Sequence, residues 1–211
     1  MSEDGGVGQQ RDREAAERTA RHAAQTGDAY DELMAEGARY FSQQDLRRAA
    51  RAAREAIALR PDEPEAYYNL GSALANSGYV VEAAQRFLEA KERCQVGSRH
   101  WAAATAWAFD MLVQEACAEV AKPEWWNDEG LKALSARVVR AAPDHAEANR
   151  MRAVVLCGQC GRAWEAGPRS AAELREAAAH FDRAMALQTA PALKAELTDR
   201  AAECRRQATA T

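Results

Sequence analysis

The stretch "PEAYYNLGSALANSGYVVEAAQRFLEAKERC", residues 64–94, decides the fold of this protein. It predicts two helices separated by Gly78, because both flanks are rich in strong helix formers and glycine commonly ends a helix. The first helix is predicted to follow Asp62, whose carboxylate can accept amide hydrogens of the first turn, and Glu65 stands three residues later, as in a capping box. The stretch therefore predicts a helix–turn–helix unit.

The unit repeats along the chain with a period of 34 residues. Several coincident pairs at one spacing indicate a repeat, whereas a single pair would carry little weight. The residues that recur at this interval are Gly37 and Gly71, Ala49 and Ala83, Ala56 and Ala90, and the bulky series Leu33, Tyr67 and Trp101. Small residues at fixed positions allow two helices to approach closely. A preceding unit is therefore expected over residues 30–61.

These residues resemble the tetratricopeptide repeat, whose pattern is Trp-x2-Leu-Gly-x2-Tyr followed by Ala-x3-Phe. Tyr67 replaces the Trp of this pattern and Leu74 replaces the Tyr. The matching positions are Leu70, Gly71, Ala83 and Phe87. The resemblance is strong over residues 30–95 and looser after that. It implies an all-α fold, a right-handed superhelical array of antiparallel helix pairs.

The remainder of the chain predicts two further units with insertions. The string "PDEPEA" at 61–66 returns as "PDHAEA" at 143–148, which is 14 residues more than two repeats. A third unit is expected from about Ser98 to Pro143, with a first helix from Trp101 to about Val120. A fourth unit is expected to pair helices 145–157 and 170–187, and "SAAE" at 170–173 predicts a capping box. Pro191 can open a capping helix that runs to about Gln207.

Two regions are therefore expected: a polar, partly disordered N-terminal segment at 1–27, and about four repeat units with a C-terminal capping helix over 28–211. The chain is 47% hydrophobic and 28% charged, with a net charge of −4 and interspersed signs. A nucleic-acid binder would need a basic face, which this balance does not favour. No apolar run has the length of a membrane span, and the N-terminus lacks the apolar core of a secretory signal. The expected location is the cytoplasm.

The resemblance implies that the chain binds another protein. In such arrays the first helix of each unit lines a concave groove, and groove positions carry partner contacts. The groove residues expected on this basis are Met34, Phe41, Tyr68, Asn69, Arg99, Ala106, Phe109, Arg150 and Val154. The clamp with which some members of the family hold a C-terminal carboxylate is incomplete, because it retains only Asn69 and Arg99. An apolar or amphipathic partner segment is therefore expected.

A redox or metal-binding protein that uses Cys157 and Cys160 is the alternative. Zinc normally takes four ligands, and the sequence has no second cysteine pair and no histidine pair at short spacing. A helix-end role without metal or cofactor is favoured, although a reversible disulfide stays open. Trp125 and Trp126 either form a contact surface or, as we favour, fold back onto the helix pair. Since no catalytic motif is present, the protein is not expected to be an enzyme.

Overall fold

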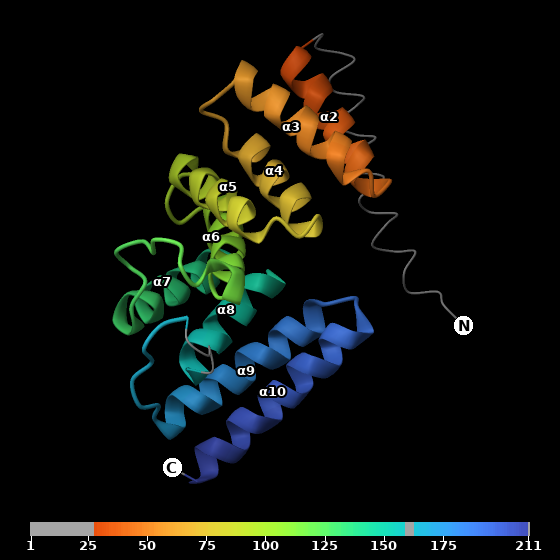
Figure 1. Ribbon diagram of the computed structural model, residues 1–211. Helices are drawn as coiled ribbons and strands as arrows, with labels where there is room; N and C mark the ends of the chain where they lie inside the picture. The colour runs from red at the N-terminus through yellow and green to blue at the C-terminus, as the bar shows by residue number, and fades with distance from the viewer. Residues whose placement is uncertain (1–27, 159–162, 211) are drawn as a thin grey trace, which may run out of the picture. The chain divides into compact units, whose positions relative to one another are not determined.

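Helices form all the regular secondary structure in residues 28–158 and 163–210, the part of the chain that the computed structural model describes. The predicted all-α class is confirmed (Figure 1). The predictions about residues 1–27 and about Cys160 lie outside the described residues. The chain divides after Cys94 into two compact units, the second of which is Gln95–Thr211.

The first unit contains two helix pairs. Each helix packs against the next one along the chain, and the first helices of the two pairs also contact each other (Figure 1). The helices are α2 (Ala29–Ser42), α3 (Leu46–Leu59), α4 (Pro64–Asn76) and α5 (Val80–Arg93). This arrangement is the expected repeat of antiparallel pairs.

Local capping signals explain where these helices begin. The Asp28 carboxylate accepts from the amide of Tyr30 at 2.9 Å, and the Asp45 carboxylate accepts from the amide of Arg48 at 3.1 Å. The predicted cap at Asp62 is wrong. Glu63 occupies the cap position of α4 without a side-chain hydrogen bond, because Pro64 at the first helical position already fixes the backbone for the helix.

Small residues hold the first unit together at its helix crossings. Ala56 of α3 and Ala66 of α4 are fully buried and join Tyr30 and Met34 in one apolar cluster. At Gly71 an added Cβ would lie 3.0 Å from the Phe87 ring, which shows how closely α4 approaches α5. The small positions of the 34-residue period therefore serve close packing, as expected.

The second unit contains five α-helices and one 3-10 turn among the residues described after position 94. Helix α6 contacts both α7 and α8, α8 packs on α9, and α9 packs on α10. The elements are α6 (Arg99–Leu112), η1 (Glu115–Cys117), α7 (Asp128–Ala141), α8 (Ala146–Cys157), α9 (Ala171–Leu187) and α10 (Pro191–Ala210). The expected third and fourth pairs and the C-terminal helix are all present.

The boundaries of the second unit agree with the sequence at α9 and differ at α6. The capping box is confirmed, since the Ser170 hydroxyl accepts from the amide of Glu173 at 3.2 Å and the Glu173 carboxylate accepts from the amide of Ser170 at 2.9 Å. Helix α6 ends at Leu112 rather than near Val120. The ammonium of Lys122 donates to the carbonyl of Leu112 at 3.1 Å, so the loop that follows α6 supplies a hydrogen-bond donor for a carbonyl at the end of the helix.

None of the described helices combines the length and apolar character required to cross a bilayer.

Candidate functional site

The predicted groove residues of the first unit lie on α2 and α4, the two neighbouring first helices. Met34 is only 5% exposed, because it belongs to the core cluster. Phe41, Tyr68 and Asn69 are partly exposed. The Tyr68 ring meets the Phe87 ring edge-on, with centroids 5.4 Å apart, which fixes its orientation. This face therefore presents two partly exposed aromatic side chains on a packed support.

The predicted groove residues of the second unit are largely closed off. Ala106 and Phe109 are each 1% exposed, and Val154 is 5% exposed. The Phe109 ring lies 5.6 Å from the Trp126 ring and 5.9 Å from the Trp164 ring, measured between centroids. A partner would have to displace both tryptophans to reach Phe109.

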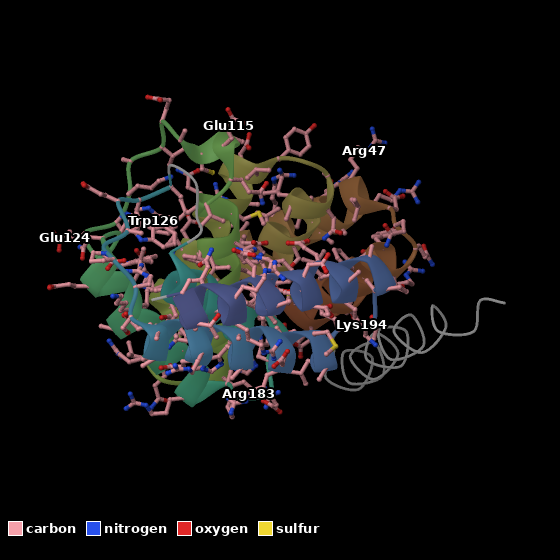
Figure 2. The ribbon with its side chains drawn as sticks, turned by 90° about the horizontal axis from the view of Figure 1, so that it is seen from below. Arg47, Glu115, Glu124, Trp126, Arg183 and Lys194 are labelled. Carbon is pink, nitrogen blue, oxygen red and sulfur yellow. The ribbon has the colours of Figure 1, made fainter. Side chains whose placement is uncertain are left out.

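The adjacent tryptophans have different environments. Trp126 is 9% exposed, whereas Trp125 is partly exposed. In Figure 2 the Glu124 side chain, two residues earlier, projects from the edge of the second unit, whereas Trp126 lies closer to its helices. The interpretation that the tryptophans fold back onto the helix pair is confirmed for Trp126.

Trp126 and Trp164, which together form a tryptophan cover over Phe109, are held in position by hydrogen bonds. The indole N–H of Trp126 donates to the carbonyl of Ala163 at 2.7 Å, and that of Trp164 donates to the Asp128 carboxylate at 3.3 Å. Arg169 donates to the same carboxylate at 2.8 Å. The hydrogen bond from Arg169 is the main cause that holds the pKa of Asp128 far below its ordinary value. The loop before α7 and the loop before α9 are thus joined over α6 by the Trp126–Trp164 ring contact and by the ion pair of Arg169 with Asp128.

The two arginines predicted for the groove already have partners within the chain. Arg99 is exposed and donates to the Asp144 carboxylate at 3.0 Å. Arg150 forms ion pairs with Asp110 of α6 and, at 2.6 Å, with Glu147. Burial lowers the pKa of Arg150 to about 10, so its guanidinium remains charged at neutral pH. A partner carboxylate would have to compete with these internal acids.

Only Cys157 of the cysteine motif lies within the described residues. Cys157 ends α8 and is 5% exposed, and its thiol is hydrogen-bonded to that of Cys204 on α10. That hydrogen bond, together with burial, raises the pKa of Cys204 far above its ordinary value. Among residues 28–158 and 163–210, no group of three or more His, Cys, Asp or Glu side chains could hold a metal ion.

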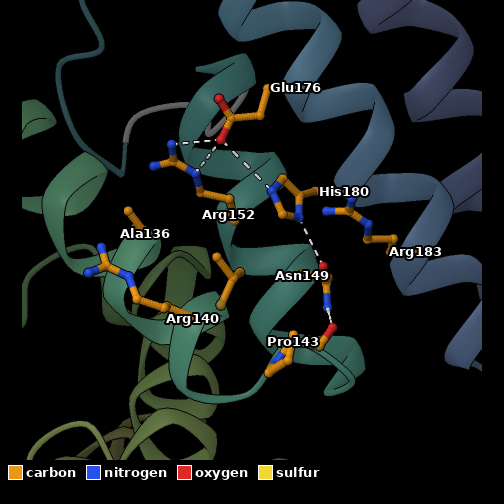
Figure 3. Close-up of a pocket in the computed structure, with 9 residues that line it drawn as sticks. Ala136, Arg140, Pro143, Asn149, Arg152, Glu176, His180 and Arg183 are labelled. Atoms are coloured by element: carbon orange, nitrogen blue, oxygen red, sulfur yellow. Dashed lines mark hydrogen bonds and ion pairs between the residues drawn. The ribbon is translucent and has the colours of Figure 1, made fainter.

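A polar pocket of about 470 Å³ opens in the second unit, and sequence reasoning missed it. Figure 3 shows its walls, which come from α7, α8 and α9. The lining residues are Ala136, Val139, Arg140, Pro143, Asn149, Arg152, Glu176, His180 and Arg183. The spacing of Glu176, His180 and Arg183, which places three polar side chains on one face of a helix, was the signal that could have indicated it.

A chain of hydrogen bonds fixes the base of the pocket. The Asn149 amide donates to the carbonyls of Pro143 at 2.8 Å and His145 at 3.0 Å, so its oxygen is the acceptor. The Nδ1 atom of His180 lies 2.9 Å from that oxygen and therefore carries a hydrogen (Figure 3). Burial is the main cause that lowers the pKa of His180, so its Nε2 atom is unprotonated at neutral pH.

Comparisons with known proteins agree with this architecture. Residues 37–78 match a family model described as TPR repeat. The structure is similar to that of PilF from Pseudomonas aeruginosa, with a TM-score of 0.59, 16% identity and coverage of 96% of this chain and 89% of that one. It is also similar to the MamA protein, with a TM-score of 0.52 and 14% identity. The similarity covers 87% of this chain and 91% of that one. No curated protein matches the chain. These likenesses show the fold, an all-α array of tetratricopeptide-like helix pairs.

Proposed function

We propose, from the tetratricopeptide repeat at residues 37–78, that this protein is a scaffold that binds another protein on the α2–α4 face of its first unit. The observation that carries the proposal is the difference between the two sets of predicted groove residues. Phe41, Tyr68 and Asn69 are partly exposed, whereas Phe109 and Val154 are covered. The proposal is therefore restricted to the first unit.

The chemistry of this face favours an apolar or amphipathic segment of a partner. Phe41 and Tyr68 supply aromatic area, and Asn69 supplies one amide that can bond a backbone group. An acidic C-terminal tail requires several converging cations, and the α2–α4 face offers none among its predicted groove residues. We expect neither a nucleic acid nor a membrane as partner, no catalytic activity, and a cytoplasmic location.

A peptide-binding measurement tests the proposal. The full chain is titrated with a set of labelled amphipathic helical peptides, and fluorescence anisotropy reports binding. Tyr68→Ser and Phe41→Ser are each expected to weaken binding about ten-fold or more, because interface aromatics commonly contribute over 1 kcal/mol. Tyr79→Ser is the matched control, since Tyr79 is 56% exposed and is not a groove position.

A second titration separates this mode from carboxylate recognition. An acidic peptide with a free C-terminus is compared with its amidated form at the same ionic strength. We expect both forms to bind weakly and equally. Micromolar affinity that vanishes on amidation would contradict the proposal, as would equal losses in the Tyr68→Ser and Tyr79→Ser variants.

A further inference from the structure

Four arginines lie close together on the exposed side of α3. They are Arg47, Arg48, Arg51 and Arg54, which we call the arginine face. Spacings of four and then three residues place Arg47, Arg51 and Arg54 along one line of the helix. The opposite side of α3 is packed through five buried alanines, so the arginines stand on a fixed support.

The arginine face keeps an excess of positive charge. Arg48 and Arg51 each pair with one carboxylate of the same helix surface, at 3.4 Å and 2.8 Å. Arg47 and Arg54 are exposed, and their guanidinium groups form no ion pair or hydrogen bond with the residues that the structure describes. Because the two existing pairs are also exposed, they are weak and can exchange for other carboxylates.

Unpaired negative charge gathers on the segment that leads from η1 to the first turn of α7. Its exposed acids are Glu115, Glu119, Glu124 and Glu129, which we call the glutamate loop. Their carboxylates form no ion pair or hydrogen bond within the described part of the chain. The lysine of this segment, Lys122, donates to main-chain carbonyls and does not neutralise them.

The two surfaces are complementary in sign. The planar donors of arginine suit carboxylate oxygens, and each surface offers four side chains. The whole chain carries a net charge of −4, so two copies repel each other on average. Attraction between copies therefore requires surfaces of opposite sign to face each other.

We propose that the arginine face binds the glutamate loop of a second copy of this chain, so that copies associate head to tail. The contact joins two different surfaces, so each added copy leaves one surface of each kind free, and growth stops only if a ring closes. Exposed ion pairs are individually weak and are screened by salt. The association is therefore reversible and belongs to high protein concentration and low salt.

Self-association on this surface goes beyond the proposed binding of another protein. The arginine face belongs to α3, the second helix of its pair, whereas the proposed partner site lies on the first helices α2 and α4. The two contacts use different surfaces of the first unit. An array of copies would thus present the α2–α4 face many times over, which strengthens binding to a partner with repeated segments.

Sedimentation equilibrium of the full chain tests the proposal. Concentrations extend up to about 1 mM, since weak contacts are populated only near their dissociation constant. The salt concentrations are about 0.01 M and about 1 M, between which the screening length falls from about 30 Å to about 3 Å. We expect the average mass to rise with concentration at low salt and to stay at the monomer value at high salt. Net repulsion alone would lower the apparent mass at low salt, so a rise identifies attraction.

Charge-reversed variants test which surfaces meet. One variant combines Arg47→Glu with Arg54→Glu, and the other combines Glu115→Arg with Glu119→Arg. Each variant alone should lose the rise in mass, because its two surfaces then share one sign. An equimolar mixture should recover the rise, since the reversed surface of each variant matches a surface of the other.

A matched control separates the arginine face from general surface charge. Arg140→Glu combined with Arg175→Glu makes the same change in net charge, at exposed arginines of α7 and α9 that have no ion pair or hydrogen bond with described residues. This variant should keep the association. Four results would overturn the proposal: a monomer at every concentration, a rise that persists at high salt, equal losses in the control and in the variant of α3, or a mixture that stays monomeric. A monomeric wild type that binds a glutamate-rich peptide through α3 would instead assign the arginine face to a different protein.

Discussion

Gly37 and Gly71 occupy the same position of consecutive repeats, yet alanine should have opposite effects at the two sites. At Gly37 an added Cβ would lie 3.5 Å from the Cβ of Ala52, an ordinary van der Waals contact. At Gly71 it would lie 3.0 Å from two atoms of the Phe87 ring. The ring is 1% exposed and packs edge-on against Tyr68, so it has little room to move.

The two magnitudes follow from helix propensity and overpacking. Replacing a glycine inside a helix by alanine stabilises a protein by about 0.5–1 kcal/mol when the site has room. Gly37→Ala should therefore stabilise the first unit by about that amount. Overpacking of a filled core costs about 1–3 kcal/mol. Gly71→Ala should consequently lower the free energy of unfolding by about 1 kcal/mol, and Gly71→Leu should lower it further.

Urea denaturation of the full chain, followed by far-UV circular dichroism, measures both effects. The variants should differ from each other by about 2 kcal/mol in the free energy of unfolding, with the wild type between them. The shared repeat position and the shared unit make each variant the control of the other. If both substitutions shift the midpoint in the same direction by the same amount, the close approach of α4 to α5 is not the reason for Gly71.

The tryptophan cover and an acid-sensitive ion pair give two further predictions. Trp126→Ala should destabilise the second unit by about 3–5 kcal/mol in urea denaturation, because it removes the ring that covers Phe109. Trp125→Ala should cost less, and equal costs would contradict the assignment of the cover to Trp126. The pKa of Glu173 is lowered from 4.5 to about 2, mainly by its hydrogen bond from Lys132. A depressed folded-state pKa stabilises the protein above the unfolded value and loses this effect as the pH falls from 4.5 toward 2. Glu173→Gln should therefore reduce the difference in urea midpoint between pH 5 and pH 3, and an unchanged difference would refute the role of Glu173.

The fold could be predicted from the sequence because its signals are local and repeated. The 34-residue spacing of Gly37 and Gly71 identified the helix pairs, and the capping box at Ser170 located the start of α9 to within one residue. The end of α6 was misplaced by about eight residues. No glycine or proline marks that end, and the Lys122 side chain that satisfies it comes from ten residues away. Helix propensity alone does not contain that contact.

The site was harder to predict because its exposure depends on insertions. Repeat position places Phe109 on a groove, and nothing near it in the sequence shows that Trp164, 55 residues later, closes over it. The pocket at His180 also depends on tertiary contacts, since three helices supply its walls and the spacing of Glu176, His180 and Arg183 indicates only the α9 wall. Repeat arithmetic predicts which face a residue occupies, whereas the covering of that face is decided by tertiary contacts.

The division of the chain after Cys94 separates the two kinds of intrinsic chromophore. All five tyrosines lie between residues 30 and 79, in the first unit, and all five tryptophans lie between residues 101 and 164, in the second. Emission excited at the red edge of the tryptophan band therefore comes from the second unit alone. Tyrosine absorbance changes come from the first unit. The wild-type chain thus carries a separate optical label in each unit, and the unfolding of one can be distinguished from that of the other without an added dye or a substitution.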